Sequence, residues 1–353
     1  MHNKIIMKRI SLANLPTKIQ KLERLSKELN TNIYIKRDDQ TGSEYSGNKV
    51  RKLEYCVADA KSKGANLLIT CGGIQSNHCR ATVAVATLLG MKSAVLLRIS
   101  DKPPVTGNYF LDKLMGADVK FCTKEEYSKH RGEIMDKMAE EYKKRGYKPY
   151  VIPEGASNDI GTLGYYNCLK EIVKQEKEMN IKFDTIVVAT GSGGTYSGLY
   201  LANEIHKYGK RIIGMAVCDN NEYFTNIVKD IATKAIAYLP ESLKKDKNGK
   251  PVQLNYNNIE FEDKYVGIGY ALSRPEELEF IKKIARLEGL VLDPVYTGKA
   301  MYGIYNELKN NGILTKDRNG KPYPSRLSKK HNILFIHTGG LYGLFPVSET
   351  FSW

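Results

Sequence analysis

The chain of 353 residues has no long hydrophobic run, and no apolar stretch approaches the roughly 18 residues of a membrane-spanning helix. Residues 1–15 lack the apolar core of a secretory signal, because basic residues separate short apolar pairs. Basic residues exceed acidic ones, 54 to 39, for a net charge of +15, but they are spread along the chain without long blocks. No zinc-finger spacing or RNP-type aromatic motif accompanies them. We therefore expect a cytoplasmic protein that binds neither a membrane nor nucleic acid.

The cysteine patterns of metal-binding and redox-active proteins are missing too. None of the six cysteines lies in a C-x-x-C pair, and the six histidines include no H-E-x-x-H motif. We expect reduced, mostly buried thiols and no metal site. Hydrophobic residues make up 42% and charged residues 26%, as in ordinary globular proteins, and the length suits two domains or one large domain.

Short runs rich in valine, isoleucine and leucine alternate with longer segments of helical periodicity. Strands are predicted at 32–38, 66–72, 93–99, 185–194, 211–217 and 332–340. Helices are predicted at 50–63, 78–89, 197–208 and 275–288. Nearly continuous apolar runs are typical of parallel strands that are buried on both faces. The alternation predicts an α/β fold with helices on both faces of a mostly parallel sheet.

A glycine-rich loop, residues 190–195, follows one predicted strand and opens the next helix. Backbone N–H groups at a helix start attract anions, and glycines allow a phosphate to approach closely. The spacing matches neither the dinucleotide pattern G-x-G-x-x-G nor the P-loop pattern, so a single phosphate is the better ligand. The alternative is a tight strand-to-helix turn without a ligand.

A second glycine-flanked turn carries Lys49 close to the start of a predicted helix. Residues 42–49 nearly match a P-loop, but Asn48 precedes the lysine and Val50 replaces the hydroxyl residue that would bind magnesium. A partly desolvated lysine can instead supply a neutral amine for a Schiff base. The alternative for a lone lysine is an ordinary solvated side chain.

A third loop, residues 71–78, ends with Ser76, Asn77 and His78 at the start of another predicted helix. A hydroxyl, an amide and an imidazole at a helix N-terminus suit a carboxylate or a ring oxygen. Capping of the helix by Ser76 or Asn77 is the alternative. A Ser/His/Asp hydrolase is disfavoured, because the chain has no G-x-S-x-G elbow.

Seven segments, taken together and in order, resemble the fold-type II pyridoxal 5'-phosphate enzymes and, within them, the 1-aminocyclopropane-1-carboxylate deaminase/D-cysteine desulfhydrase family. The segments are "YIKRDDQTG" (34–42), "SGNKVRKLEY" (46–55), "LITCGGIQSNHCRATVAVA" (68–86), "PYVIPEGASNDIGTLGY" (149–165), "VVATGSGGTYSGL" (187–199), "ARLEGLVLDPVYTGKAMYG" (285–303) and "ILFIHTGG" (333–340). The resemblance implies two open twisted α/β domains with mostly parallel sheets and the cofactor between them. It implies a larger domain of residues 1–51 plus 166–353, a smaller domain of residues 52–165, and a homodimer.

The resemblance also implies roles for individual residues. Lys49 would hold pyridoxal 5'-phosphate as a Schiff base and act as the catalytic base, and Tyr270 or Tyr296 would donate a proton to the leaving group. Ser76 would be catalytic as well, and the carboxylate of a small amino-acid substrate would lie at Ser76, Asn77 and His78. The implied cofactor-binding residues are Lys49, Asn77, Gly191, Ser192, Gly193, Gly194, Thr195, Thr297 and Thr338.

Deaminases of the family usually carry a glutamate after the second tyrosine, where this chain has Thr297. A carboxylate would keep the pyridine nitrogen protonated, whereas a threonine cannot, so the resemblance favours β-elimination over opening of a cyclopropane ring. The predicted reaction is α,β-elimination of D-cysteine to pyruvate, hydrogen sulfide and ammonia. The alternatives are deamination of 1-aminocyclopropane-1-carboxylate, a lyase reaction on another β-substituted amino acid such as cysteate, and pyridoxal-phosphate homeostasis without turnover.

Overall fold

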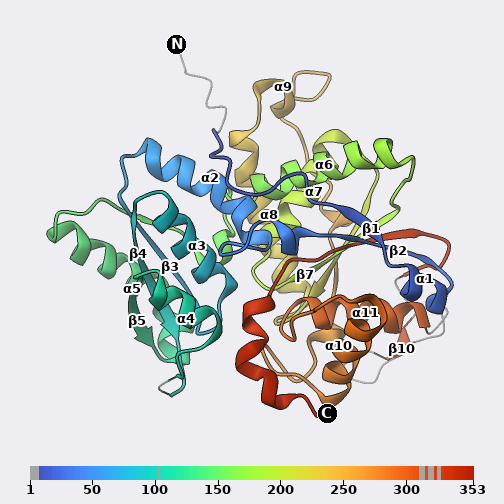
Figure 1. The fold of residues 1–353 in the computed structure, drawn as a ribbon. Coiled ribbons are helices and arrows are strands. Elements are labelled where there is room, and N and C mark those ends of the chain that lie inside the picture. Colours follow the sequence, from blue (N-terminus) through green and yellow to red (C-terminus); the bar gives the residue numbers. More distant parts are fainter. Residues whose placement is uncertain (1–7, 102, 310–314, 317–321, 324–326) are drawn as a thin grey trace.

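The larger of two parallel sheets joins the two ends of the chain, as Figure 1 shows. The computed structural model describes residues 8–101, 103–309, 315–316, 322–323 and 327–353. The six strands of this sheet lie in the order β1 (Ile19–Lys21), β2 (Asn32–Lys36), β12 (Asn332–Ile336), β7 (Thr185–Thr190), β8 (Arg211–Ala216) and β9 (Glu260–Glu262). Only the edge pair of β1 with β2 is antiparallel. The fold is therefore α/β with mostly parallel strands, as predicted.

The smaller sheet is formed by strands from residues 67–151 and lies on the left in Figure 1. Its four strands are all parallel, in the order β5 (Asp118–Cys122), β4 (Lys92–Arg98), β3 (Leu67–Gly73) and β6 (Pro149–Val151). Two further short strands, β10 (Thr315–Lys316) and β11 (Pro322–Tyr323), pair with each other in antiparallel orientation.

Helices pack on both faces of the large sheet, and the alternation of side chains along its strands explains why. In β12, Ile333 and Phe335 belong to the core formed with α1, α10 and α11, whereas Leu334 and Ile336 belong to the core formed with α6, α7 and α8. The helices are α1 (Glu23–Leu29), α2 (Asn48–Ser62), α3 (Asn77–Leu88), α4 (Gly107–Leu114), α5 (Lys124–Lys144), α6 (Leu163–Met179), α7 (Gly194–His206), α8 (Asn221–Ala235), α9 (Glu241–Lys244), α10 (Pro275–Glu288) and α11 (Thr297–Lys309).

All six predicted strands and all four predicted helices are present, with differences at their ends. The largest differences are at β7 and β12, which end before the glycines that the predictions included in strands 185–194 and 332–340. These glycines lie in loops that follow the carboxyl ends of the strands, except Gly194, which begins α7. The proposed boundaries near residues 51 and 165 fall inside α2 and α6, and residues of both helices share one core with α3 and α7. The domain division stays a prediction.

A buried ionic cluster fixes α2 against the large sheet. Arg51 is 2% exposed and donates to both carboxylate oxygens of Asp38 at 2.8 Å and to Glu171 at 2.9 Å. Tyr165 donates to Asp38 at 2.5 Å, and Lys36 donates to Glu171 at 2.5 Å. Because a buried charge is costly without a partner, this cluster holds the first turns of α2 in one position.

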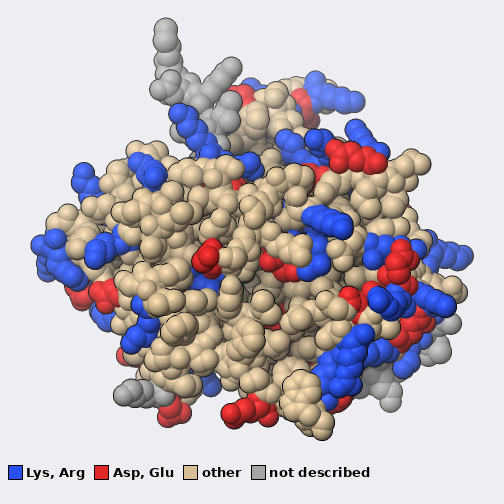
Figure 2. Space-filling model, in the orientation of Figure 1, with Lys and Arg blue, Asp and Glu red and all other residues tan. Residues whose placement is uncertain are grey.

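The six cysteines are free thiols, and five of them are buried, as predicted. Burial raises the pKa of Cys56 and of Cys71 to about 12. Within the described ranges, no helix is long and apolar enough to cross a membrane, and no three histidine, cysteine or acidic side chains group as metal ligands would. Figure 2 shows basic and acidic side chains interspersed over one face, with large uncharged areas between them.

Candidate active site

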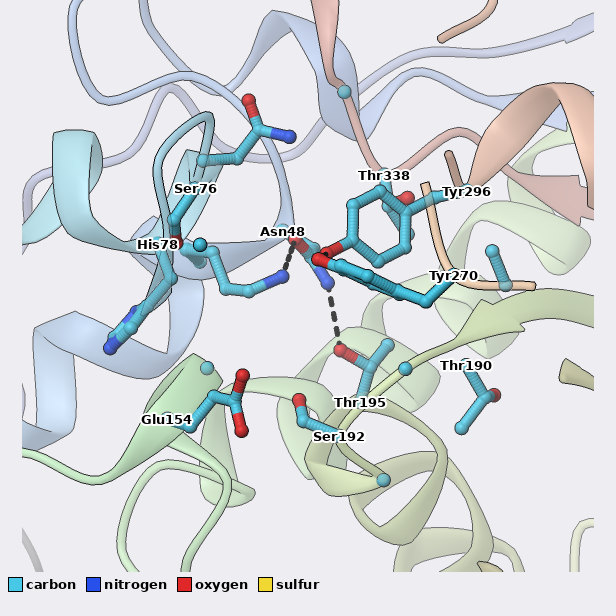
Figure 3. A pocket seen from close by; sticks show the side chains of 18 residues that line it. Asn48, Ser76, His78, Glu154, Thr190, Ser192, Thr195, Tyr270, Tyr296 and Thr338 are labelled. Atoms are coloured by element: carbon cyan, nitrogen blue, oxygen red, sulfur yellow. Dashed lines mark hydrogen bonds between the residues drawn. The ribbon is translucent and has the colours of Figure 1, made fainter. Parts of the chain in front are cut away.

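A cavity is lined by segments that follow strands of both sheets (Figure 3). Residues after the carboxyl ends of β3, β7 and β12 contribute to it, which is where open α/β sheets bind ligands. The lining residues are Asn48, Lys49, Gly73, Ser76, Asn77, His78, Glu154, Gly155, Ala189, Thr190, Gly191, Ser192, Gly193, Thr195, Tyr270, Tyr296, Thr338 and Gly339. The fold thus brings the predicted site residues to one cavity, with the exception of Gly194 and Thr297.

Lys49 reaches this cavity from the first turn of α2. Its Nζ donates to Asn48 Oδ1 at 2.8 Å, and Asn48 Nδ2 donates to Thr195 Oγ1 at 2.9 Å (Figure 3). Burial lowers the pKa of Lys49 to about 8, although the charge of Asp293 opposes this shift. A useful fraction of the amine is therefore neutral near neutral pH, which is what a Schiff-base lysine requires.

A cradle of small residues forms between β7 and α7. Gly193 has a φ of 83°, in the left-handed region that glycine adopts without strain. A Cβ on Gly194 would lie 2.6 Å from Ser157 Oγ, so a larger residue would close the cradle. Ser192 Oγ lies 2.8 Å from Ser157 Oγ. Two hydroxyls and the N-terminus of α7 together suit a phosphate.

Lys52, which the sequence did not mark as a site residue, lies buried beside this cradle. Its Nζ contacts Ser157 Oγ at 3.4 Å, and no carboxylate in the described part of the chain pairs with it. Burial, together with the charge of Lys49, holds the pKa of Lys52 well below its ordinary value. A phosphate in the cradle would supply the missing counter-ion.

The turn between β3 and α3 presents the predicted hydroxyl and amide. Ser76 caps α3 by accepting from Cys79 N at 3.2 Å, and the residue lines the cavity. The amide oxygen of Asn77 accepts from Asn108 at 3.2 Å. His78 lines the cavity, but its ring points away from Asn48 in Figure 3 and its Nε2 lies 2.7 Å from the Thr70 hydroxyl. Its imidazole therefore supports the turn from behind.

Tyr270 and Tyr296 form a hydroxyl pair on another wall of the cavity. Their oxygens lie 2.5 Å apart, so one hydroxyl donates to the other. Burial raises the pKa of Tyr270 to about 12, and burial together with Tyr270 raises the pKa of Tyr296 further. Both tyrosines are therefore protonated at neutral pH. Lys49 Nζ lies 5.9 Å from the centre of the Tyr296 ring, so an amine and two hydroxyls face the same space.

Thr338 lines the cavity, whereas Thr297 lies outside its lining. Thr297 is fully buried at the start of α11, and its hydroxyl donates to Asp293 Oδ1 at 2.6 Å. Asp293 also accepts from the backbone N–H groups of residues 295–297. An aspartate shortly before a helix start frequently caps the helix, so the sequence itself could have indicated this role of Asp293.

Glu154 is a further cavity residue that sequence reasoning missed. Its carboxylate points into the cavity in Figure 3, on the side of Ser192. Its charge raises the pKa of Lys49, against the larger effect of burial. Within the described ranges its side chain forms no hydrogen bond or ion pair. No local motif marks this position, because its partners across the cavity come from distant parts of the chain.

These residues fit pyridoxal phosphate. The cradle with Lys52 suits its phosphate, the amine of Lys49 suits its aldehyde, and the Thr338 hydroxyl is available to its ring. Two parallel-sheet units with a lysine and a phosphate cradle at one cavity define a class, the fold-type II pyridoxal-phosphate enzymes.

Comparisons with known proteins give the same class and narrow it. The family described as pyridoxal-phosphate dependent enzyme matches residues 10–321. The bifunctional D-cysteine desulfhydrase/1-aminocyclopropane-1-carboxylate deaminase of Arabidopsis thaliana, a mitochondrial protein, is 41% identical over 95% of this chain and 79% of its own. The D-cysteine desulfhydrase of Klebsiella pneumoniae is 37% identical over 96% of this chain and 95% of its own.

A solved structure described as a homologue of ACC deaminase has a TM-score of 0.82 and 38% identity, and covers 99% of this chain and 98% of its own. The chain belongs to the family of pyridoxal-phosphate dependent enzymes, in the group that holds the D-cysteine desulfhydrases and 1-aminocyclopropane-1-carboxylate deaminases.

Proposed function

We propose that the protein catalyses α,β-elimination of D-cysteine to pyruvate, hydrogen sulfide and ammonia. One observation carries the proposal: the amine of Lys49, with its pKa lowered to about 8, shares a cavity with the protonated hydroxyls of Tyr270 and Tyr296. Elimination needs a base for the α-proton and an acid for the leaving group. The names of the relatives from Arabidopsis and Klebsiella support the substrate.

In this mechanism the chain's own residues bind the substrate and move its protons. The Ser76 hydroxyl, the Asn77 amide and the N-terminus of α3 hold the substrate carboxylate. Bound pyridoxal phosphate supplies an electron sink for the α-carbon. Lys49 removes the α-proton, and one of the two cavity tyrosines gives a proton to the departing sulfur. The net reaction consumes one water, which hydrolyses the remaining three-carbon product to pyruvate and ammonia.

The proposed roles place the remaining residues around the cofactor. The backbone of residues 191–195, with the Ser192 and Thr195 hydroxyls and the Lys52 ammonium, would hold the phosphate. Asn77 and Thr338 would contact the ring. Thr297 would act on the ring only through the turn that it shares with Asp293, because its hydroxyl already donates to that carboxylate.

Deamination of 1-aminocyclopropane-1-carboxylate is the second candidate, because the bifunctional relative at 41% identity is named for both activities. Thr297 lies outside the cavity lining and does not decide between the two reactions, whereas the Klebsiella relative, named for D-cysteine desulfhydrase alone, favours elimination. We also propose a homodimer in the cytoplasm. Light scattering that gives twice the chain mass of 39.8 kDa would support the dimer, and a single-chain mass would contradict it.

The test measures sulfide and pyruvate release from D-cysteine and L-cysteine by the purified holoenzyme, with 1-aminocyclopropane-1-carboxylate alongside. We expect release from D-cysteine, and we expect Lys49→Ala to abolish both turnover and the yellow absorbance of the bound cofactor. Lys61→Ala, on an exposed position of the same helix, is the matched control and should behave as wild type. Turnover retained in Lys49→Ala, or no release from D-cysteine, would contradict the proposal.

A further inference from the structure

A second cavity of about 520 Å³ adjoins the first. Four residues line both of them: Gly73, Asn77, Tyr270 and Tyr296. The hydroxyl pair of Tyr270 and Tyr296, assigned above to protonation of the leaving group, thus stands at the junction. Much of the remaining wall is apolar, including Ile74, Ile99, Leu272, Leu278, Val295 and Val347. A thiol alone does not need a space of this size.

Two cations line this second cavity, and one of them, Arg98, is half-buried in its wall. It is the last residue of β4 and pairs in register with Gly73 of β3, so it stands at the carboxyl ends of the parallel strands. Its guanidinium lies 5.0 Å from the ring centre of Tyr127 and 5.4 Å from that of Tyr270. Nη2 is 3.6 Å from the place where a Cβ on Gly73 would lie. Two aromatic rings therefore hold this charge beside the junction of the cavities.

Arg98 is half-buried, and its guanidinium makes no hydrogen bond or ion pair with the residues that the structure describes. None of the other charged residues that line this cavity pairs with the Arg98 guanidinium. Asp293 already accepts four hydrogen bonds from residues 295–297, and Lys124 and Asp101 are exposed. A guanidinium offers five donors in a planar fork that matches the oxygens of a sulfate or phosphate ester.

We propose that the second cavity receives the β-substituent of the substrate and that Arg98 selects an anionic one. This inference rests on the proposed function, because it extends the same elimination to amino acids that carry a sulfate or phosphate ester on the β-carbon. The Cα–H bond and the Cβ–O bond break, and the oxygen leaves with both bonding electrons as sulfate or phosphate. One water then converts the three-carbon remainder to pyruvate and ammonia. No oxidant or reductant is needed.

The test compares O-phospho-D-serine with D-cysteine as substrates of the wild-type holoenzyme and of Arg98→Met, which keeps an apolar stem but loses the charge. We expect kcat/KM for O-phospho-D-serine to fall about 10- to 100-fold in Arg98→Met, as for loss of a charge-assisted hydrogen bond. The value for D-cysteine should change by less than about 3-fold. Arg98→Lys should restore part of the loss. Lys92→Met, at the exposed first position of the same strand and outside both cavities, should leave both substrates unchanged.

Calorimetric titration of each holoenzyme with O-phospho-D-serine gives a second reading that does not depend on turnover of D-cysteine. The proposed subsite requires weaker binding in Arg98→Met by the same factor. An equal loss for both substrates would assign Arg98 to the α-carboxylate and overturn the inference, as would wild-type protein that neither binds nor converts O-phospho-D-serine. Inactivity toward D-cysteine with Arg98-dependent binding would overturn the proposed function and leave the subsite supported.

Discussion

A lysine with an ordinary pKa of about 10.4 is almost wholly protonated at neutral pH, and a protonated amine cannot bond to an aldehyde. Burial at the start of α2 lowers the pKa of Lys49 to about 8. Because each unit of pKa changes the neutral fraction about tenfold, this shift increases the neutral fraction of the amine near pH 7 by more than a hundredfold. Asn48 fixes the direction of the amine, because its Oδ1 accepts from Nζ. At this scale, one neighbour orients the amine, and burial sets its protonation.

We therefore predict that the apoprotein takes up pyridoxal phosphate faster as the pH rises. The rate should grow about tenfold per pH unit below 8 and level off above it, because the neutral fraction of Lys49 follows that curve. Stopped-flow absorbance from pH 6.5 to pH 9.5 checks this, with free Nα-acetyl-lysine as the control amine. A rise that continues unchanged up to pH 9.5 would show an unshifted lysine.

The tyrosine pair gives a second prediction at the scale of single residues. Tyr270→Phe and Tyr296→Phe should each lower kcat for D-cysteine, and the variant that removes the proton donor should lose about 10²- to 10⁴-fold. Because the two hydroxyls share one hydrogen bond at 2.5 Å, the double variant should lose little more than the worse single one. Steady-state kinetics of the three variants decide this. If the double variant loses the product of the two single fold-reductions in kcat, the hydroxyls act independently.

The elements that carry the site differ in how far the sequence alone could place them. The segments around Lys49, Ser76 and 190–195 could be predicted, because each is a local pattern of glycine and polar residues between a strand and a helix. Lys52 and Glu154 could not, because their relevance depends on side chains distant in the chain. All predicted strands are Val/Ile/Leu-rich, whereas the missed β5 is a mostly exposed edge strand. Buried strands therefore have a sequence signal that edge strands lack.

The start of α11 shows the same limit in one residue. Thr297 was expected beside the cofactor ring, but its hydroxyl donates to Asp293 within its own turn. The Thr297 hydroxyl therefore takes part in local capping instead of facing the cavity. Residue type alone does not decide which of these two positions a threonine hydroxyl adopts. The carboxylate of Asp293 instead fixes the backbone on which Tyr296 stands.

We predict that Thr297→Val destabilises the protein, because it removes one donor from the buried carboxylate of Asp293 while keeping the shape of the side chain. The expected cost is about 1–3 kcal/mol in the free energy of unfolding. Thr297→Ser keeps the donor and should cost less. Urea denaturation of both variants measures the difference. A Thr297→Val protein as stable as Thr297→Ser would show that this bond contributes nothing.

At the scale of the whole molecule, the cluster of Asp38, Arg51 and Glu171 ties the N-terminal segment and α6 to the helix that starts at Lys49. The guanidinium of Arg51 and its neighbours hold the pKa of Asp38 below its ordinary value against the opposing effect of burial. A lowered folded-state pKa stabilises the protein at pH values above the ordinary carboxyl pKa. That contribution is lost as the pH falls below it.

Arg51→Met should therefore lower the free energy of unfolding by about 3–5 kcal/mol at pH 7, because it leaves Asp38 charged and buried. The gap between variant and wild type should narrow as the pH falls from about 7 to about 3, because without Arg51 the buried carboxyl group of Asp38 takes up a proton at a higher pH than in the wild type. Urea unfolding followed by circular dichroism over this pH range measures both. Lys129→Met, which breaks an exposed pair with Glu125, is the control and should resemble wild type. A gap that does not depend on pH would assign the loss to packing alone.

The burial of the thiols described above affects how the protein reacts with oxidised forms of its proposed substrate. When D-cysteine is oxidised to its disulfide, an accessible protein thiolate can attack that disulfide, forming a mixed disulfide and releasing one D-cysteine thiolate. Here five cysteines are buried, and burial raises the pKa of all six thiols, so thiolates are scarce at neutral pH. The arrangement therefore protects the protein's own thiols from disulfides of the proposed substrate.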